Sequence, residues 1–575
     1  MVSTVDRLIN HALDCEVLVI GGGCAGLFSA IKAREAGRKV ILVDKAYVGR
    51  SGCSPFAAGA INVCLPEDDK DVWLEEIVTR GEYLNDQEWV KLQLEEGYKL
   101  VDELQGWGKQ YGKVVMDTDD HGRYIRRKAR GNIKTLTGII NALPMMDTLR
   151  RKSLEVGIEL VERIMVTHLF LHEGRVAGAL GLHTRTGELY LFTARAVILA
   201  AGGCGFKGFF IGHHNLTGEA HFMAFRAGAW LRNLDQAMSN TTARALDIHG
   251  LSHMVGCGGR FLNSQGEEFM LRYDPEVGSR ARLTKLVIGM AKEIQAGRGP
   301  IYMDLTRVVS EDQVMLRRIL PEGFRAFERM GIDPFKNLIE WIPSFEGSLA
   351  HGGGVHINIK CESNIPGLYA VGDSSCTPEH GTWSITGLNL TFCFISGARA
   401  GHFSAEYAPH ISLAEPAKIA DQVAVAVEEV LAPLKRSGGT DSDEFTYRLL
   451  ETLIPYKVAY LRTESTLKEA LTRVQRLRQE ELERVHARDP HELVKANEAR
   501  SMVWVGEMIL ESVLFRKESR GFVYREDYPN TDNINWVKWI MLCQEKDRVK
   551  VWAQDFPTPY VQPPLKVYSP FGGSV

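Results

Sequence analysis

Three glycines and one aspartate near the N-terminus have the types and the spacing that bind a dinucleotide. An apolar segment leads into a turn that contains Gly21, Gly23 and Gly26, and an apolar helix face follows. Gly21 permits a tight turn, Gly23 lets backbone approach a pyrophosphate, and Gly26 lets the helix pack close to the strand. Asp44 ends a second apolar segment, 21 residues after Gly23, where it can accept a hydrogen bond from a ribose hydroxyl. This order predicts an adenine dinucleotide with its pyrophosphate at a helix N-terminus.

Composition and charge restrict the classes of protein to which the chain can belong. With 575 residues it exceeds one simple core, so we expect two or three domains. Its residues are 45% hydrophobic and 24% charged, as in ordinary globular proteins. The net charge of −4 offers no basic field, and no apolar run reaches the roughly 18 residues of a membrane span. We therefore expect neither a nucleic-acid partner nor a transmembrane segment.

The ten cysteines indicate reduced thiols rather than a metal cluster. No two of them form a Cys-x-x-Cys pair, so we expect no ferredoxin-type cluster and no metal site. His249 and His253 are four residues apart, but no further ligands complete a zinc site. The cysteines expected in glycine turns are interpreted as small turn residues, not a disulfide: Cys24, Cys53, Cys204 and Cys376. Reduced thiols and a start without a secretory signal predict a cytoplasmic protein.

Three apolar segments with glycine punctuation are expected to join one nucleotide-binding domain, although they lie far apart in the chain. They are residues 15–26, 196–203 and 365–373. The segment between the last two would contribute an inserted domain. Within it, the turn residues Asn263 to Gly266 predict a hairpin over 259–266.

The last third of the chain has a different pattern. Apolar residues recur there at near-helical spacing among charged residues, and Pro455 and Pro490 divide the run into separate helices. After about residue 530 the chain is rich in aromatic residues and proline, which predicts an extended tail over the surface. The predicted units are a nucleotide-binding domain (1–234 and 346–415), an inserted domain (235–345), a helical domain (416–530) and a tail (531–575).

A series of ordered motifs makes the chain resemble a known family. They are Val19–Gly26, Arg50–Gly52, Ala200–Gly203, Asn215–His221, Ile301–Leu305, Gly352–Gly354, Gly367–Asp373, His380-Gly381 and Glu518–Gly521. Over nearly its whole length the chain is similar to the flavoprotein subunits of fumarate reductase, succinate dehydrogenase, L-aspartate oxidase and adenylylsulfate reductase. The resemblance implies an α/β fold with an FAD-binding Rossmann-like domain of the glutathione-reductase type, an inserted α+β capping domain and a C-terminal helical bundle. It implies an FAD-dependent oxidoreductase that transfers a hydride between a small-molecule substrate and the flavin.

The resemblance also assigns cofactor contacts to the matched positions. The glycines of the first turn would approach the pyrophosphate, and Asp44 would hold the adenosine ribose. Ser51 and Gly52 would lie on the loop that passes the isoalloxazine, and Asp373 would bind the ribityl chain. The complete set of predicted cofactor residues is Gly21, Gly23, Gly26, Asp44, Lys45, Ser51, Gly52, Ala58, Gly59, Gly202, Gly203, Asp373 and Leu390.

One departure from the family pattern concerns how FAD is held. In the membrane-bound dicarboxylate enzymes a histidine after Arg-Ser attaches FAD covalently, and here that position is Gly52. The segment Arg50–Gly52, followed by Ala58–Asn62, instead resembles the loop of adenylylsulfate reductase. We therefore expect non-covalent FAD and a lower-potential flavin suited to reduction.

Departures on the substrate side predict a substrate other than fumarate or succinate. The family's His-Pro-Thr-Gly becomes Met238–Thr241, and its Thr-Glu pair becomes Leu251-Ser252. The arginine that grips a carboxylate in His-Gly-Ala-Asn-Arg becomes Ser384. Losing a bidentate arginine and two polar partners would cost a dicarboxylate several kcal/mol of charge-assisted hydrogen bonding.

Arg280 and His380 are the candidate catalytic residues. The arginine before the capping helix, which donates a proton to the substrate in this family, persists as Arg280, with Arg282 as the alternative counterpart. His380 follows the Gly372-Asp373 turn, where it can stabilise negative charge on a reduced flavin. The alternatives are a salt-bridged arginine at a domain edge and a histidine that binds only backbone.

The resemblance implies a partner for electron transfer, because this chain has no cluster cysteines of its own. Electrons would be exchanged with a separate iron–sulfur subunit, which could also bring the protein to a membrane. Three alternatives remain open at this point. They are the α subunit of an adenylylsulfate reductase, a soluble L-aspartate-oxidase-like enzyme without such a partner, and a flavin-bearing electron-transfer subunit without its own substrate.

Overall fold

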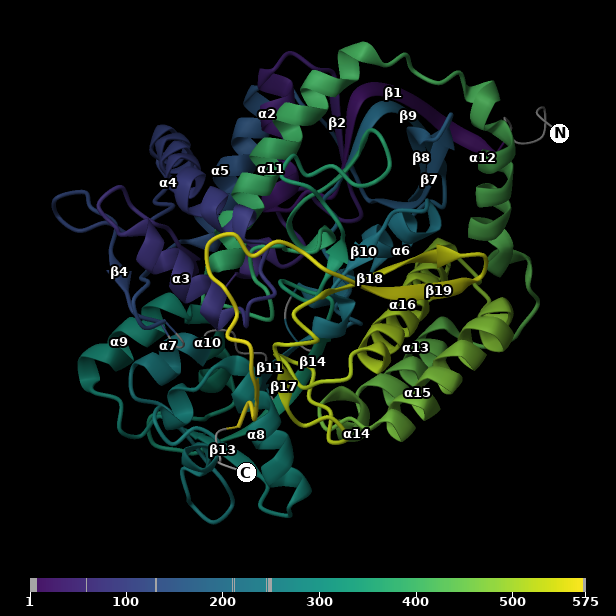
Figure 1. Ribbon diagram of the computed structural model, residues 1–575. Helices are drawn as coiled ribbons and strands as arrows, with labels where there is room; N and C mark the ends of the chain where they lie inside the picture. Colours follow the sequence, from purple (N-terminus) through teal and green to yellow (C-terminus); the bar gives the residue numbers. More distant parts are fainter. Residues whose placement is uncertain are drawn as a thin grey trace.

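A mixed sheet of seven strands joins segments that are far apart in the chain (Figure 1). The computed structural model describes residues 8–571 except 58, 130–131, 209, 211, 245 and 247–250. The strand order is β6-β2-β1-β9-β8-β7, and β16 also pairs with β9. The strands are β1 (Ile9–Ile20), β2 (Val40–Asp44), β6 (Glu159–Glu162), β7 (Ile164–His172), β8 (Arg175–His183), β9 (Leu189–Leu199) and β16 (Leu368–Ala370). Because β1, β9 and β16 pair in parallel, the three segments predicted to share a domain do meet in one sheet.

The turn after β1 depends on two glycines. Gly21 has a φ of +112°, and a Cβ atom there would lie 2.2 Å from the carbonyl oxygen of Ala200. A Cβ atom on Gly26 would lie 1.9 Å from the carbonyl oxygen of Gly21, so only glycine lets α2 (Cys24–Glu35) pack this close to the strand. The predicted order of strand, turn, helix and strand is confirmed.

Helices cover the sheet and carry part of the pocket wall. Helix α11 (Leu388–Tyr407) packs against α2 and α4 (Gln87–Gln110), and α5 (Ala142–Glu155) packs against the same two helices. The other elements of this part are α3 (Lys70–Arg80), α6 (Glu219–Arg226), α12 (Pro416–Leu431), and a small sheet of β3 (Ala60–Asn62), β5 (Thr137–Ile139) and β4 (Arg126–Arg127). Buried residues of α4, α5, α6 and α11 join the apolar core around β1 and α2, whereas α3 and α12 each pack in a smaller apolar cluster beside it.

A second, antiparallel sheet lies in the lower part of Figure 1 with its own helices. Its strands, in order, are β11 (Met238–Ala243), β14 (Ile339–Gly347), β13 (Ile301–Asp304) and β12 (Arg260–Leu262). The helices beside it are α7 (Leu251–Gly256), α8 (Leu283–Gln295), α9 (Ser310–Ile319) and α10 (Pro321–Arg329). All these elements come from the segment predicted as the inserted α+β domain, whose boundaries stay a prediction.

The predicted hairpin over 259–266 is wrong in its pairing. The turn is present, since the Gly266 amide donates to the Asn263 carbonyl oxygen at 3.0 Å. However, β12 pairs with β13 rather than with the residues after the turn. The chain beyond Glu267 instead enters a short 3-10 helix that buries Phe269 and Met270, so no second hairpin strand forms.

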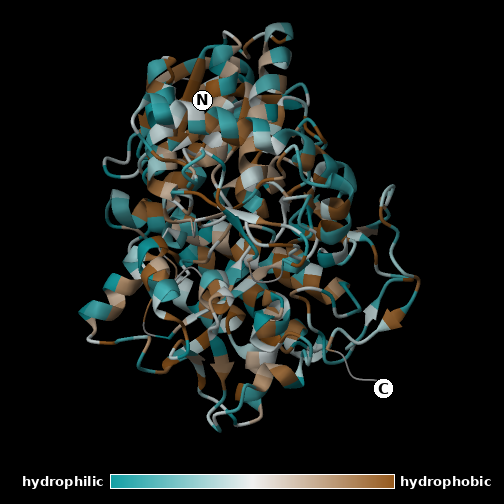
Figure 2. Ribbon diagram, turned by 90° about the vertical axis from the view of Figure 1, so that its left-hand side faces the viewer, coloured by the Kyte–Doolittle hydropathy of each residue, from teal (hydrophilic) through white to brown (hydrophobic). Residues whose placement is uncertain are grey.

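The helices predicted for the last third of the chain are confirmed. They are α13 (Ser442–Leu453), α14 (Tyr456–Ala459), α15 (Glu464–Arg476) and α16 (Pro490–Phe515). Pro490 occupies the first turn of α16, where the Asp489 carboxylate caps the backbone, so this proline begins a helix rather than breaking one. In Figure 2 the helices alternate between teal and brown, as expected of helices that bury one face.

The predicted extended tail is only partly extended. Residues of β18 (Trp539–Glu545) and β19 (Arg548–Gln554) form an antiparallel hairpin, which joins β10 (Leu231–Arg232) and β15 (Gly354–Val355) in a four-stranded sheet. The first four residues of β18 are buried, which explains why this aromatic stretch folds as a strand. The remaining tail crosses the front of the molecule in yellow in Figure 1 and pairs β20 (Val567–Tyr568) with β17 (Thr531–Asp532).

Within the described residues, none of the helices is both long enough and apolar enough to cross a membrane.

Candidate active site

A deep pocket lies at the carboxyl ends of β1, β2 and β9, between the first turns of α2 and α11. It holds about 1290 Å³ of empty space, including its opening to solvent. Nine predicted cofactor residues line it: Gly21, Gly23, Asp44, Lys45, Ser51, Gly52, Gly202, Asp373 and Leu390. Sequence reasoning therefore located this pocket from residues up to 369 positions apart.

The other predicted cofactor residues have different places. Gly26 lies behind the pocket wall and serves the packing described above. Gly203 also serves packing, because a Cβ atom there would lie 1.7 Å from the Ser348 carbonyl oxygen. The Gly59 carbonyl oxygen accepts the amide of Ile140 at 2.9 Å, and this glycine is outside the pocket lining. Ala58 lies outside the described residues.

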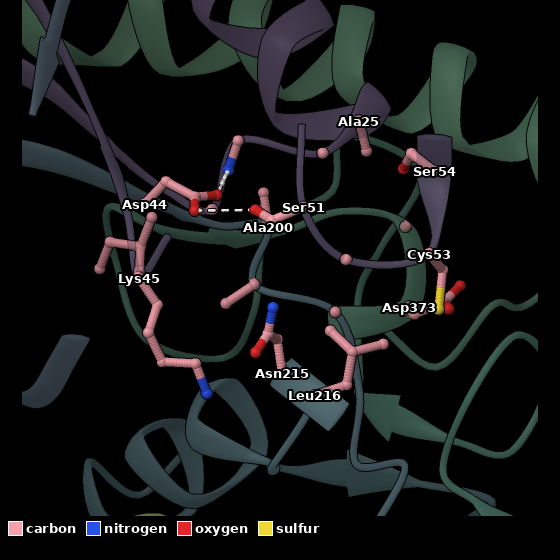
Figure 3. A pocket seen from close by; sticks show the side chains of 18 of the residues that line it. Ala25, Asp44, Lys45, Ser51, Cys53, Ser54, Ala200, Asn215, Leu216 and Asp373 are labelled. Carbon is pink, nitrogen blue, oxygen red and sulfur yellow. Dashed lines mark hydrogen bonds between the residues drawn. The ribbon is translucent and has the colours of Figure 1, made fainter. Parts of the chain in front are cut away.

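Asp44 faces the pocket in a fixed orientation (Figure 3). Its Oδ2 accepts the Gly22 amide at 2.8 Å, while its Oδ1 accepts the Ala46 amide at 2.7 Å and the Ser51 hydroxyl at 3.2 Å. An ionised carboxylate has about four acceptor sites, so a ribose hydroxyl can still bind. The side chain is thus positioned by the turn that it follows.

The Lys45 amine is held by protein carboxylates. Its Nζ donates to Thr217 Oγ1 at 2.9 Å, to Glu219 at 2.8 Å and to Glu498 at 2.9 Å. Burial opposes the charge, but Glu219 and Glu498 outweigh it and hold the pKa of Lys45 above its ordinary value. Because its amine is occupied by these partners, Lys45 would contact a bound cofactor through the aliphatic part of its side chain, which lines the pocket.

Sequence reasoning missed several residues of the pocket wall. Ser54 Oγ accepts the Cys24 amide at 3.2 Å, at the first turn of α2. Asn389 donates to Asp373 Oδ1 at 2.9 Å, and its own Oδ1 is buried without a partner among the described residues. Asn215 is the first residue of the family motif Asn215–His221, so the sequence could have identified it. The pocket residues from β7 belong to none of the family motifs and could not have been identified in this way.

Two helix N-termini meet at this pocket. The N-caps of α2 and α11 are Gly23 and Gly387, which have no side chains to cap their helices, and in α2 the Cys24 amide donates to Ser54. Free amides and the helix dipole favour an anion at such ends. Together with Asp44, the pocket fits a nucleotide with a pyrophosphate at one helix and a group that gains negative charge at the other.

Comparison with known families decides the cofactor. The family described as FAD binding domain matches residues 16–390, and the one described as fumarate reductase flavoprotein C-term matches residues 448–568. The chain belongs to the fumarate reductase and succinate dehydrogenase flavoprotein family. The predicted α/β fold, the FAD cofactor and the assignment as an FAD-dependent oxidoreductase are thereby confirmed.

Known relatives match over almost the whole chain. A subunit of the fumarate reductase (CoM/CoB) of Methanothermobacter marburgensis is 28% identical over 563 residues, which cover 94% of this chain and 98% of that protein. The solved E. coli quinol fumarate reductase FrdA is 22% identical with a TM-score of 0.87, covering 96% and 98% of the two chains. Adenylylsulfate reductase from Archaeoglobus fulgidus is 21% identical with a TM-score of 0.81, covering 96% and 97%. The two structures show that the fold is shared.

A cluster of buried histidines lies next to the FAD pocket. The Ala350 backbone amide contacts the half-buried Asp373 carboxyl, and the following residue, His351, is 5.4 Å from His380 between ring centroids. Phe522 stacks on the other side of His351 at 5.0 Å. Burial lowers the pKa of His380 to about 3 and that of His351 well below its ordinary value, so both rings are neutral at pH 7.

Arg282, not Arg280, reaches this cluster. Its guanidinium donates to Glu82 Oε1 at 2.8 Å from one nitrogen, and to Thr382 Oγ1 and the Trp383 carbonyl oxygen at 3.2 Å from another. Its Nε is buried and has no partner among the described residues. The Arg280 side chain is exposed. Of the two candidate arginines, only Arg282 lies beside the histidine cluster, while the catalytic role of either arginine stays a prediction.

Glu379 is a further residue that sequence reasoning missed. It is fully buried, its Oε1 lies 4.0 Å from His380 Nε2, and neither carboxylate oxygen has a hydrogen-bond partner among the described residues. Burial raises the pKa of Glu379 well above its ordinary value, which favours the neutral acid over the carboxylate. His253 lies in α7, but His249 is outside the described residues, so the predicted histidine pair is not placed.

Protein stability is expected to fall as pH drops from 6.5 to 4.5. His221, His351 and His380 are buried and hold folded-state pKa values below 6.5, with that of His221 at about 4. The unfolded chain therefore binds more protons in this window, and each histidine costs on the order of 1 kcal/mol per pH unit. Calorimetry at saturating FAD should show this loss, and His221→Gln should reduce the slope. The exposed-histidine control His402→Gln should not, and a flat profile would contradict the assignment.

Proposed function

We propose that this FAD enzyme transfers a hydride between the flavin and an organic substrate other than a simple dicarboxylate, and exchanges electrons with an iron–sulfur subunit. The observation that carries the substrate proposal is Ser384. It is fully buried where the family places a carboxylate-binding arginine, and its hydroxyl donates to the His380 carbonyl oxygen at 2.6 Å and accepts from Asn85 at 3.1 Å. Serine supplies no positive charge to a carboxylate, and its hydroxyl is already occupied by these two hydrogen bonds.

The site residues would divide the remaining work. FAD, when bound, supplies the redox chemistry. Arg282 is the proposed proton donor, because hydrogen bonds to Thr382 and to the Trp383 carbonyl oxygen hold its guanidinium against the His380 loop and a third bond ties it to Glu82. Neutral His380 and His351 would orient the substrate, and the Glu379 acid would supply a proton beside His380. Glu82 connects Arg282 to an outer cavity, from which the arginine can regain its proton.

FAD would be held without a covalent bond. Gly52 lines the FAD pocket, has no side chain to form a bond, and has a φ of +72° that disfavours other residues. A Cβ atom there would meet nothing within 4 Å. The backbone conformation, and not a lack of space, therefore favours glycine at this position. Non-covalent contacts from the α2 turn and Asp44 would hold FAD.

The proposal of an electron-transfer partner rests on the chain's own cysteines and on its relatives. None of the ten cysteines, all of which lie within the described residues, forms a disulfide, and no group of three or more potential metal ligands occurs in that part of the chain. The Methanothermobacter relative is named as one subunit of its enzyme, which indicates a multi-subunit assembly for that protein. A separate protein would therefore accept or supply the electrons.

The proposed function is tested on enzyme purified without oxygen, together with whatever subunits co-purify. Acid precipitation should leave all FAD in the supernatant. The dithionite-reduced enzyme is then mixed with fumarate, an unsaturated monocarboxylate, adenylylsulfate or oxygen, and flavin absorbance is followed. We expect an acceptor other than fumarate to reoxidise the flavin and an iron-containing subunit to co-purify. Reoxidation fastest with fumarate would overturn the substrate proposal, and rapid reoxidation by oxygen alone would favour the aspartate-oxidase-like alternative.

A further inference from the structure

A second cavity lies on the outer side of Arg282, between the C-terminal tail and the capping helix α8. It holds about 1160 Å³ of empty space including its opening. Its walls come from the end of α3 and the following loop, from the start of α8, from residues 519–524, and from the tail between Pro564 and Phe571. In Figure 1 the yellow tail comes down to α8, although the two segments are far apart in the sequence.

Positive charge predominates in this second cavity. Five cationic side chains line it, against the acidic side chains of Glu82 and Asp274: Arg80, Arg282, Lys285, Arg520 and Lys566. Three of the cations are neutralised. Arg282 pairs with Glu82 at 2.8 Å, Lys285 pairs with Asp274 at 2.8 Å, and Arg520 pairs with Glu518 at 2.7 Å.

Arg80 and Lys566 have no carboxylate partner among the described residues. The nearest acid on the helix of Arg80 is Glu76, whose carboxylate already accepts three backbone amides between Ile133 and Thr135. Burial and the charge of Arg282 lower the pKa of Arg80, which means that its charge is held at a cost. The Lys566 amine lies 5.4 Å from the centre of the Tyr568 ring, and both residues belong to the tail segment that lines the cavity. An anion bound between Arg80 and the tail would offset the repulsion between Arg80 and Arg282.

The second cavity and the histidine cluster share Arg282. One of its nitrogens contacts Glu82 in the cavity wall, and another contacts Thr382 and Trp383 on the His380 loop. A molecule whose reacting end lies at His380 would thus place its far end among the outer cations. An extended substrate would use these outer cations, whereas the two charges of a short dicarboxylate would both have to lie near Ser384.

We infer that this cavity is the subsite for a remote anionic group of the substrate, held between Arg80 and Lys566. The inference rests on the proposed function and extends it: the substrate class is an elongated organic acid with a carboxylate, sulfonate or phosphate at the end that does not react. Arginine favours such groups because its planar fork donates two parallel hydrogen bonds. Lys566 supplies a point charge from the tail.

Binding of small anions to the FAD-loaded enzyme tests the inference. Inorganic phosphate and glutarate are titrated by calorimetry into the wild type, Arg80→Gln and Lys566→Gln. The control is Arg325→Gln, an exposed arginine on α10 that pairs with Glu322. We expect at least one probe to bind the wild type and to bind both cavity variants about tenfold more weakly, as for one lost charge-assisted hydrogen bond. The probe that binds distinguishes a phosphate-like from a carboxylate-like end.

The outcomes separate this inference from the proposed function. No binding of either probe, or equal binding in the wild type and both variants, overturns the subsite whatever the flavin does. For an acceptor that reoxidises the flavin, Arg80→Gln should act mainly on KM, because Arg80 contacts a part of the substrate remote from the reacting atoms. A KM unaffected by Arg80→Gln also overturns the subsite while leaving the proposed hydride transfer intact. Phosphate binding without any turnover supports the subsite and counts against the proposed function.

Discussion

Replacing Arg282 with glutamine is expected to lower turnover by about 10²–10⁴-fold while FAD remains bound, as for loss of a positioned proton donor. The guanidinium is fixed by Glu82, Thr382 and the Trp383 carbonyl oxygen, so no neighbouring cation can take its place without moving. Glutamine keeps part of the volume and can still donate a hydrogen bond, but it carries no charge and no acidic proton. Flavin absorbance and thermal unfolding monitor cofactor binding and folding, and stopped-flow flavin reoxidation measures turnover.

The matched comparison is Arg280→Gln, two residues away and exposed. We expect this variant to lose much less activity than Arg282→Gln. Arg282→Lys keeps the charge but not the planar fork, so intermediate activity is expected. Equal losses at the two arginines would show that a surface role of this segment had been mistaken for catalysis. A loss confined to Arg280→Gln would restore the assignment made from the sequence.

Truncating Glu518 is expected to lower the free energy of unfolding by about 3–5 kcal/mol, because it leaves the buried Arg520 without its carboxylate and Arg516 with Asp235 alone. Glu518 accepts from Arg516 at 2.8 Å and from two nitrogens of Arg520 at 2.7 and 3.0 Å. All three side chains are essentially inaccessible to solvent, and Arg516 also binds the buried Asp235 at 2.6 Å. Urea unfolding of FAD-loaded Glu518→Ala against the wild type measures the loss.

The control for this prediction is Glu428→Ala, which breaks the exposed pair with Lys435. Exposed pairs of this kind contribute about 0–1 kcal/mol, so the midpoint should hardly move. Glu518→Gln keeps the volume and one good acceptor, and an intermediate loss is expected. Similar midpoints for Glu518→Ala and Glu428→Ala would mean that water or another group replaces the carboxylate.

The Glu518–Gly521 motif has an energetic role that also reaches the active site. Arg520 donates to the Glu82 carbonyl oxygen at 2.7 Å, and the Gly521 amide donates to Glu82 Oε2 at 3.0 Å. Glu82 in turn holds Arg282. The C-terminal motif therefore positions the proposed proton donor, although it lies more than 200 residues away from it in the chain.

Local patterns in the sequence predicted the parts of the fold in which neighbouring residues interact. The glycine turn after β1 and the strand ending at Asp44 were correct because steric limits at Gly21 and Gly26 act over a few residues. The helix begun by Pro490 was correct for the same reason. The hairpin over 259–266 failed because the partner of β12 lies about 40 residues away, at β13. Similarly, nothing local showed that the aromatic stretch after residue 538 would pair with β10.

Spacing in the sequence determined that an adenine dinucleotide binds, because the groups that bind it are backbone amides and one acid at fixed short intervals. The family match then identified the dinucleotide as FAD. Only the tertiary structure decided which of the candidate residues lie beside the histidine cluster. Arg280 ends a 3-10 turn and Arg282 follows in extended backbone, so the direction of each side chain depends on that change of geometry. Glu379, Glu82 and the outer cations likewise acquire their environment from segments brought together across the whole chain. Side-chain direction and burial are collective properties of packing, and no spacing in the sequence encodes them.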